Sequence, residues 1–310
     1  MQQHVDFLRT IGAALAVFIS SCGVNAQAVY VPSVYKSSFG DGLKVEKYKT
    51  GYYNTYQDAD NYAGVEYGQH VFETGDWLAR GEQLAYVSKA HPANAATHSM
   101  MLGYNTLQGG RTTWVTDATY SRPIHGGTTA EISFNRDRVE VQQSLMTHVM
   151  ANTYGLSVER KLLEPLTVQV AKTEAKYTDG NHRQLSKTKA TYEAWPEYGL
   201  SLQMRARYFR NSDTSVNSGY FNPYRFVESM GAIDFNKTYK GWVLGANIGY
   251  GRQAGGDDPK TLAKAFEFSA TTPPASHVFV RAKAGYFRSL GYGGSDFIYR
   301  YVSEDVVIQF

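Results

Sequence analysis

Cationic side chains recur in pairs two residues apart, a spacing that matters in an extended chain. Pairs of this kind include Lys187 with Lys189, Arg205 with Arg207, and Arg281 with Lys283. In a β-strand, residues i and i+2 point to the same face, so each pair would present two positive charges together. Ammonium and guanidinium groups donate hydrogen bonds to carboxylates, phosphates and hydroxyls, and rows of charged side chains line pores that guide such solutes.

Two hypotheses account for these cations, and both can hold at once. The cations form a basic stripe that guides an anionic or polyhydroxyl substrate, or they pair with carboxylates on the same face and brace the wall of the protein. The acids that alternation places on that polar face are Asp117, Glu131, Glu193, Glu228, Asp234 and Glu267.

The segment from Gly219 to Phe226 contains four aromatic rings in what reads as one connection. Tyr220, Phe221 and Tyr224 are candidate substrate contacts, because aromatic faces stack on sugar rings while neighbouring asparagine and arginine side chains bind hydroxyls. The alternative is structural: the rings fold hydrophobically into the mouth of the protein, or they mark the top of a strand.

Ser144 and His148 come closest to a catalytic arrangement, because some barrel enzymes that hydrolyse lipids use a Ser-His pair. The pair stands alone at i, i+4, and the sequence contains no G-x-S-x-G, H-E-x-x-H, P-loop or Rossmann motif. Asp257 and Asp258 lack the further ligands that a calcium site needs. We therefore expect no enzyme, cofactor or metal site, and we keep a lipid-modifying barrel enzyme as an alternative.

The composition limits the class of protein. Of 310 residues, 43% are apolar and 14% aromatic, and the formal net charge is +3. This content excludes a disordered chain, and so small a charge gives no argument for nucleic acid. The mean hydropathy is −0.40, and beyond the N-terminus no stretch approaches the roughly 20 apolar residues of a spanning helix. The 24 tyrosines and 29 glycines are typical of a large antiparallel β-protein.

The first 28 residues resemble a secretory signal peptide. Arg9 supplies a positive charge, Ile11–Ile19 is an apolar run too short to span a bilayer, and Ala26–Ala28 is an A-x-A cleavage site. The mature chain would then begin at Val29 and contain no cysteine. The alternative is a lipoprotein in which Cys22 is acylated and becomes the first residue.

Apolar and polar residues alternate with a period of two through the rest of the chain. The segments 198–208, Trp242–Tyr250 and Val278–Tyr286 follow this pattern, which places the two sets on opposite faces of a strand. Leu185 and Phe279 are exceptions that fall on the polar face. The pattern also slips near Val170, which predicts a bulge there.

Strands of this kind build either a soluble sandwich with the apolar face inward or a membrane barrel with the apolar face outward. The apolar rows run about ten residues, the length of a tilted spanning strand. Tyr or Trp stands at the ends of the rows, as in interfacial aromatic girdles. The polar face carries more charge than a sandwich core could neutralise. The sequence therefore favours an all-β fold, a transmembrane antiparallel up-and-down β-barrel.

We predict about sixteen strands, an even number that brings both termini to one end and encloses an aqueous channel. Connections counted back from the C-terminus alternate long and short, as in outer-membrane barrels, and this alternation weakens toward the N-terminus. The expected strands are 30–38, 43–56, 62–73, 77–88, 98–107, 111–121, 128–136, 152–161, 166–177, 183–194, 198–210, 226–236, 242–252, 262–271, 278–288 and 297–310.

Several segments carry a resemblance to a known family. Val302–Phe310 resembles the C-terminal strand that the bacterial outer-membrane insertion machinery recognises. Between about Arg136 and Gln253, the chain resembles the C-terminal barrel of exopolysaccharide secretion channels such as the cellulose-secretion porin. The similar segments are Arg136–Val139, Asp179–Arg183, Tyr220–Phe226, the strand containing Trp242, and Gly249–Gln253.

The resemblance implies export of an exopolysaccharide across the outer membrane. Members of that group usually carry helical repeats before the barrel, and no such repeat is visible in this chain, so the resemblance also implies a separate scaffold protein. We expect residues 1–28 to be a signal peptide and residues 29–310 to be a barrel located in the bacterial outer membrane. The alternatives are a general or selective porin for small solutes and the lipid-modifying enzyme. The expected partners are outer-membrane lipid and lipopolysaccharide, a polysaccharide substrate, and a periplasmic scaffold or polysaccharide export protein.

Overall fold

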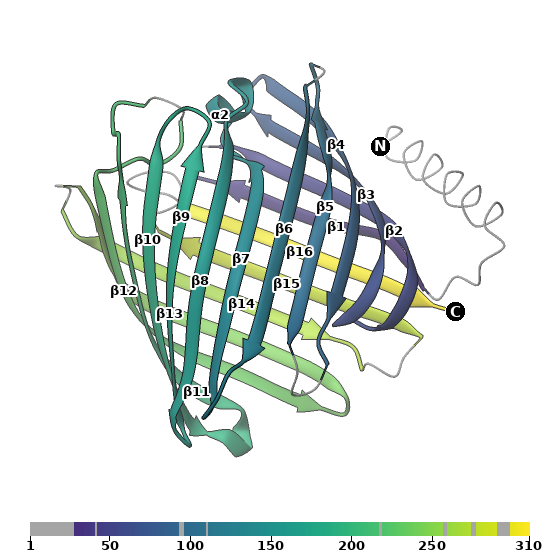
Figure 1. Cartoon of the computed structure of the whole chain (residues 1–310), viewed down its shortest axis with the longest axis vertical. Helices are drawn as coiled ribbons and strands as arrows, with labels where there is room; N and C mark the ends of the chain where they lie inside the picture. The colour runs from purple at the N-terminus through teal and green to yellow at the C-terminus, as the bar shows by residue number, and fades with distance from the viewer. Residues whose placement is uncertain are drawn as a thin grey trace.

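A computed structural model shows one closed antiparallel β-barrel (Figure 1). The structure describes residues 28–40, 42–92, 96–109, 111–216, 219–256, 259–273, 277–289 and 298–310. The strands are β1 (Ala28–Phe39), β2 (Lys44–Asp58), β3 (Asn61–Thr74), β4 (Trp77–Ala90), β5 (Thr97–Leu107), β6 (Arg111–Pro123), β7 (Thr128–Arg138), β8 (Met150–Leu163), β9 (Leu166–Tyr177), β10 (His182–Trp195), β11 (Leu200–Asn211), β12 (Arg225–Tyr239), β13 (Trp242–Gly255), β14 (Thr261–Thr271), β15 (Val278–Arg288) and β16 (Ile298–Gln309).

The predicted fold class is confirmed. Sixteen strands follow one another around the barrel in chain order, and β1 pairs with β16 to close it. Two short helical segments interrupt the connections, α2 (Gln142–Met146) and η1 (Pro196–Tyr198). In the part of the chain that the structure describes, no helix is long and apolar enough to cross a membrane. Residues 1–27 of the predicted signal peptide, with Cys22, and the pair Asp257 and Asp258 lie outside the described residues. Ala28, the last residue of the predicted signal peptide, is the first residue of β1.

Two local predictions are wrong. β11 begins at Leu200 rather than at 198, because the chain first makes the turn η1 and Gly199 then takes a φ of 71°. A Cβ at Gly199 would lie 2.1 Å from the carbonyl oxygen of Asn236, so the turn needs glycine. The predicted slip near Val170 is absent, since β9 pairs with β8 and β10 through this position without a bulge.

The alternation places apolar side chains outside the barrel and polar ones inside. On β11, Leu202 and Met204 face outward and are 44% and 75% exposed. Arg205 and Arg207 face the lumen, where Arg207 contacts Ser289 beyond β15. An outward apolar band of this kind is the surface that hydrocarbon covers in membrane barrels.

A bulge marks the seam where the barrel closes on itself. The pairing of β1 with β16 shifts register between Tyr30 and Val34. The backbone N–H of Val306 donates to Ser33 Oγ at 2.9 Å, and Thr50 Oγ1 donates to the carbonyl of Tyr30 at 3.0 Å. Side chains thus bond backbone groups that lie beside the irregularity in the ladder.

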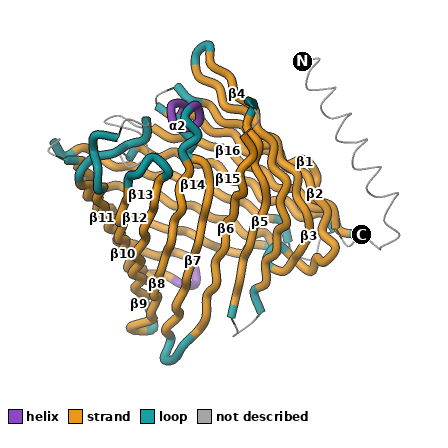
Figure 2. The backbone as a smooth tube through the Cα atoms, turned by 45° about the horizontal axis from the view of Figure 1, so that its top comes forward, coloured by secondary structure: helices purple, strands orange, loops and turns teal. Residues whose placement is uncertain are grey.

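The two ends of the barrel differ in their connections (Figure 2). At the turn end, which carries the start of β1 and the end of β16, only residues 164–165 join β8 to β9. At the loop end, residues 139–149 join β7 to β8 and residues 212–224 join β11 to β12. The predicted alternation therefore holds in the C-terminal part. It is weak toward the N-terminus, where residues 75–76 join β3 to β4 at the loop end.

Candidate functional site in the lumen

The four central cations predicted from the sequence line one cavity on the lumenal wall, which we call the basic cavity. It has a volume of about 430 Å³ and is bordered by Lys187, Lys189, Arg205 and Arg207. In the β10–β11 ladder, Lys187 lies directly opposite Arg207 and Lys189 lies opposite Arg205. Like charges opposed on neighbouring strands are destabilising, so bracing of the wall alone does not explain the arrangement.

The position of Arg207 is explained by the second hypothesis, in which a cation pairs with a carboxylate and braces the wall. Its guanidinium donates to Glu228 Oε2 at 3.2 Å and to Ser289 Oγ at 2.8 Å, and it lies 5.0 Å from the centre of the Phe226 ring. Ser289 Oγ also donates to Glu228 Oε2 at 2.7 Å. The Arg207 and Glu228 side chains are only 16% and 15% exposed. This network ties β11 and β12 to the segment that follows β15.

The other three cations bring their charge to the cavity wall without such a partner. Arg205 Nε donates to the neutral Gln203 Oε1 at 2.9 Å. Among the described residues, Lys187, Lys189 and Arg205 form no ion pair. The cavity wall holds four cations against two carboxylates, Glu131 and Glu228. It is therefore a net positive site that can bind carboxylate, phosphate or sulfate groups.

Arg281 and Lys283 face the lumen on β15 but lie apart from the basic cavity. Arg281 stands opposite Asp305 in the β15–β16 ladder, and its guanidinium lies 5.4 Å from the centre of the Phe279 ring. Lys283 stands opposite Ser303. The six predicted cations thus form two separate groups on the lumenal wall.

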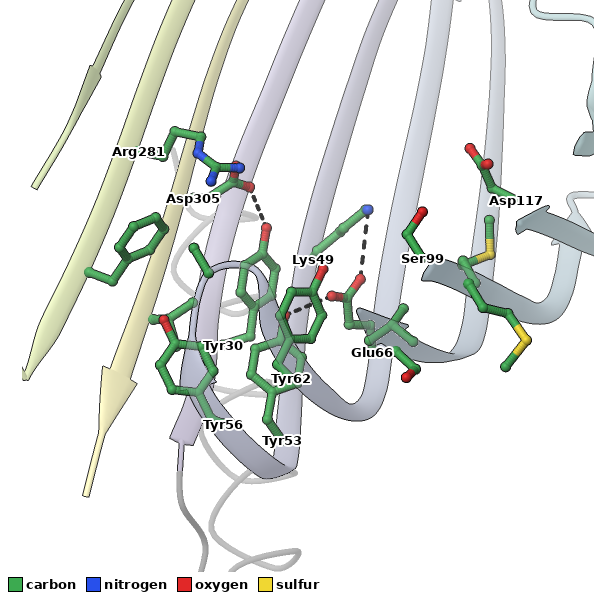
Figure 3. Close-up of a pocket in the computed structure, with 17 residues that line it drawn as sticks. Tyr30, Lys49, Tyr53, Tyr56, Tyr62, Glu66, Ser99, Asp117, Arg281 and Asp305 are labelled. Carbon is green, nitrogen blue, oxygen red and sulfur yellow. Dashed lines mark hydrogen bonds and ion pairs between the residues drawn. The ribbon is translucent and has the colours of Figure 1, made fainter. Parts of the chain in front are cut away.

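A second lumenal cavity lies near the turn end (Figure 3), and the sequence did not predict it. It has a volume of about 370 Å³, and its lining includes Arg281 and four tyrosines, Tyr30, Tyr53, Tyr56 and Tyr62. The ring of Tyr53 stacks on Tyr56 at 5.8 Å and packs against Tyr62 at 4.8 Å. We call this the tyrosine cavity.

Carboxylates hold two of these tyrosines in place. The Tyr53 hydroxyl donates to Glu66 Oε1 at 2.8 Å, and the Tyr30 hydroxyl donates to Asp305. Glu66 also forms an ion pair with Lys49 at 3.7 Å, and Figure 3 shows these two side chains facing each other. Aromatic faces beside carboxylates and a lysine are groups that can contact both the rings and the hydroxyls of a sugar.

Leu185 and Phe279, the two apolar residues that fall on the polar face, make apolar contacts inside the lumen. Phe279 packs against the buried cluster that contains Tyr30 and Tyr53. Leu185 packs against the buried pair Phe209 and Phe226. An apolar residue on a polar face therefore marked a place where the lumen is filled rather than open.

Tyr220 serves to fold the loop between β11 and β12. Its ring stacks on Tyr177 at 4.6 Å. Its hydroxyl donates to Asp179 Oδ2 at 2.9 Å and accepts a hydrogen bond from Asn181 Nδ2 at 3.0 Å. Burial and the bond to Asp179 raise the pKa of the Tyr220 hydroxyl, which keeps it a neutral donor.

The other two loop aromatics differ from one another. Phe221 packs edge-on against Phe209 at 6.2 Å and against Phe226 at 5.9 Å. Tyr224 is 67% exposed. The structural alternative thus accounts for Tyr220 and Phe221, and Tyr224 is the one of the three whose ring is free to meet a ligand at the loop end.

The loop between β7 and β8 folds into the loop end of the lumen. Leu145 of α2 is buried in a cluster with Leu43 and Phe72. Glu140 forms an ion pair at 2.6 Å with Lys47, which lies on β2. The loop therefore reaches across the barrel from β7 and narrows this end of the lumen.

Ser144 and His148 both belong to this inward loop. Ser144 is fully buried, so its hydroxyl is not exposed to a lipid. His148 takes a φ of 59°, and burial together with the nearby Arg111 and Arg138 lowers its pKa. The geometry fits a structural role for this segment.

The fold and the site together define a class of protein. A closed sixteen-stranded barrel with an apolar exterior, a polar lumen and long loops at one end has the architecture of bacterial outer-membrane channels. No protein-family model matches the sequence, and no curated protein does.

The barrel is similar to several solved structures. It resembles a bacterial polysaccharide outer membrane secretin with a TM-score of 0.68 and 14% identity, over 93% of this chain and 99% of that chain. It also resembles CdiB from Acinetobacter baumannii, with a TM-score of 0.50 and 9% identity, over 91% of this chain and 60% of that chain. For OccK7 from Pseudomonas aeruginosa the TM-score is 0.49 with 8% identity, over 92% of this chain and 98% of that chain. The predicted resemblance to a polysaccharide-secretion barrel is thus confirmed at the level of the fold.

Proposed function

We propose that this protein is an outer-membrane channel through which an exopolysaccharide leaves the cell. The observation that carries the proposal is the similarity to a polysaccharide secretin barrel along almost the full length of both chains. In this function the signal peptide directs secretion, the outward apolar band lies in the outer membrane, and the turn end faces the periplasm.

The lumen supplies the path for the polymer. The tyrosine cavity with Arg281 lies near the turn end and meets the polymer first. Lys283 follows on the wall, and Lys187, Lys189, Arg205 and Arg207 contact the polymer in the basic cavity. Tyr224 contacts it where it leaves at the loop end. Each contact replaces part of the hydration of a sugar and is weak alone, so the chain can slide from one group to the next.

The polymer must be delivered to the turn end by another protein. A periplasmic scaffold or a polysaccharide export protein is the partner that this function requires. The short connections at the turn end leave that face free of long loops, for example at residues 164–165 and 240–241. The delivering partner would dock there.

A clean deletion of the gene tests the proposal. Synthesis of the polymer should continue, and polymer should accumulate in the periplasm and be lost from the cell surface. Expression of the intact chain should restore surface polymer. Normal surface polymer in the deletion strain would refute the export function.

A porin for small anions is the second candidate. It is favoured by Lys187, Lys189 and Arg205, which line the basic cavity and form no ion pair with another residue that the structure describes. A porin conducts without a partner, so the purified protein in planar bilayers would be open at once and would let small anionic solutes into liposomes. An exporter that opens only during secretion would show little conductance, because the loop holding α2 narrows the lumen.

A further inference from the structure

A carboxylate stands on the outer face of β16, among side chains that belong to the apolar band. Glu304 lies near the middle of this strand. Val302, two residues before it, is 60% exposed on the outside of the barrel. Because residues i and i+2 of a strand share a face, Glu304 points outward as well, and it is exposed. The next residue, Asp305, points into the lumen, where it lines the tyrosine cavity.

The outward neighbours of Glu304 are apolar on every side. In the two ladders that flank β16, Glu304 stands opposite Val34 of β1 and Ala282 of β15. Along β16 its neighbours on the same face are Val302 and Val306. Among the residues that the structure describes, none forms a hydrogen bond or an ion pair with the Glu304 carboxylate. The barrel therefore presents an uncompensated negative charge on this part of its outer wall.

Glu304 lies within the apolar band rather than at its rim. Tyr286 shares the outer face of β15 with Ala282 and stands opposite Arg300 near the loop end, and the Arg300 guanidinium lies 5.9 Å from the centre of its ring. Outward tyrosines of this kind lie at the level of the lipid headgroups. Glu304 is four residues further than Arg300 toward the turn end. An ionised carboxylate at this depth costs free energy unless a cation reaches it.

A lysine on the next strand carries the complementary charge on the same outer face. Lys36 of β1 stands opposite Val302 of β16 and opposite Glu46 of β2. Its ammonium pairs with Glu46 at 2.9 Å, and Glu46 lies on the side of β1 away from β16. The Lys36 side chain is still 52% exposed, and an ammonium has three donors, so this one pair does not exhaust it.

The outer wall beside these two charges is formed by small side chains. On β15, Ala282 and Ala284 face outward and are both exposed. Ala284 stands opposite Val302, so the small residues adjoin Glu304 directly. Small side chains allow neighbouring segments in a membrane to approach closely. We call the surface made by Lys36, Ala282, Ala284, Val302 and Glu304 the seam patch, because it covers the line where β1 meets β16.

We propose that a second copy of this chain docks on the seam patch, so that Glu304 of each copy pairs with Lys36 of the other. A two-fold axis along the membrane normal brings the same patch of both copies together, and a patch that holds one acid and one base side by side is complementary to itself. Acyl chains carry no cation that could compensate Glu304, whereas the second copy supplies one to each carboxylate. The inference rests on membrane insertion, which the proposed function shares, and it does not depend on the solute that passes through the lumen.

The test measures the oligomeric state of the full chain, by native mass spectrometry in detergent and by single-molecule photobleaching in lipid bilayers. The wild-type protein should be a dimer. E304K and K36E should each raise the dissociation constant of the dimer at least about tenfold, because a close charge pair at an interface contributes about that factor or more. A mixture of E304K with K36E should form mixed dimers, because opposite charges then meet again at both positions. An ion pair within one chain cannot produce this recovery.

A282W tests the same surface without a change of charge, because an outward indole is tolerated by lipid but keeps a second barrel away. E174K and V170W make matched changes on the outer face of β9 and should dimerise as the wild type does. Heat-modifiable migration on gels checks that each variant folds.

A monomeric wild-type protein in bilayers would overturn the proposal. So would a dimer that survives A282W, an absence of mixed dimers from the two folded charge variants, or loss of the dimer in the β9 variants. A monomer that still restores surface polymer would refute the dimer and leave export standing. A deletion strain with normal surface polymer would refute export and leave the dimer standing.

Discussion

Gly219 lies against Gln143, so the loop between β11 and β12 touches the loop between β7 and β8 at the loop end of the lumen. A Cβ on Gly219 would lie 2.7 Å from Cβ of Gln143. Glu140 anchors the second loop to Lys47 on β2 at 2.6 Å. The two loops therefore support each other at the loop end of the lumen.

Breaking the Lys47–Glu140 ion pair should widen the mouth. We expect Lys47→Ala and Glu140→Ala each to raise the single-channel conductance in planar bilayers, because the loop loses its anchor on β2. The swapped variant K47E/E140K keeps the pair with its charges reversed and should return the conductance toward that of the wild type. An unchanged conductance in both single variants would contradict a role for this contact in closing the lumen.

Reversing one charge in the basic cavity should change ion preference. Lys187→Glu places a carboxylate opposite Arg207 and removes a cation, so the preference for anions should fall. The reversal potential in a potassium chloride gradient measures this. Lys172→Glu makes the same charge change on the outer face of β9 and should leave the reversal potential as it is. A similar shift of the reversal potential in both variants would show that the change in ion preference does not come from charge in the lumen.

Glu228→Gln should both destabilise the barrel and increase its anion preference. The change leaves Arg207 with Ser289 and a neutral amide in place of a carboxylate. Loss of a charged hydrogen bond at a half-buried site costs about 1–3 kcal/mol. Unfolding by urea in detergent, followed by tryptophan fluorescence, measures the loss. Glu131→Gln in the same cavity is the control, and it should alter ion preference with a smaller effect on stability.

Acid should loosen the loop that carries α2. The pKa of His148 is lowered in the fold, mainly by burial, so folding favours the neutral imidazole. Its contribution to loop stability is complete above the usual pKa of about 6.5 and is lost as the pH falls through the lower value of the folded state. The protection factors of residues 139–149, which correct for the intrinsic pH dependence of amide exchange, should therefore be lower at about pH 5 than at about pH 7.5. His148→Gln should remove this difference, and its persistence in the variant would assign the effect to another group.

The strands were predictable because each one is apolar on a single face. A slip of one residue would turn a whole row from hydrocarbon to water, so the pattern fixes both the strand and its register. The start of β11 was missed because Pro196 and Gly199 impose a turn that alternation does not report. The strand pattern carries no such information about turns.

The lumen was predictable in its residue types and not in its contacts. Alternation placed Arg207 and Glu228 on the inner face, but the contact with Ser289 joins segments 82 positions apart in the sequence. The tyrosine cavity was missed for the same reason, since Tyr30 meets Asp305 only once the barrel is closed. Contacts across a lumen depend on the number of strands and on where the loops fold inward, which local periodicity does not determine.

The seam between the first and last strands has a consequence for biogenesis. β16 is the final twelve-residue strand of the chain, and it supplies one of the two edges that close the ring. Until β16 pairs with it, β1 exposes a row of unbonded amides that lipid cannot satisfy within the bilayer. A chain truncated before Ile298 would therefore not form a smaller pore. It would be unable to enter the bilayer, and the cell would have to degrade it.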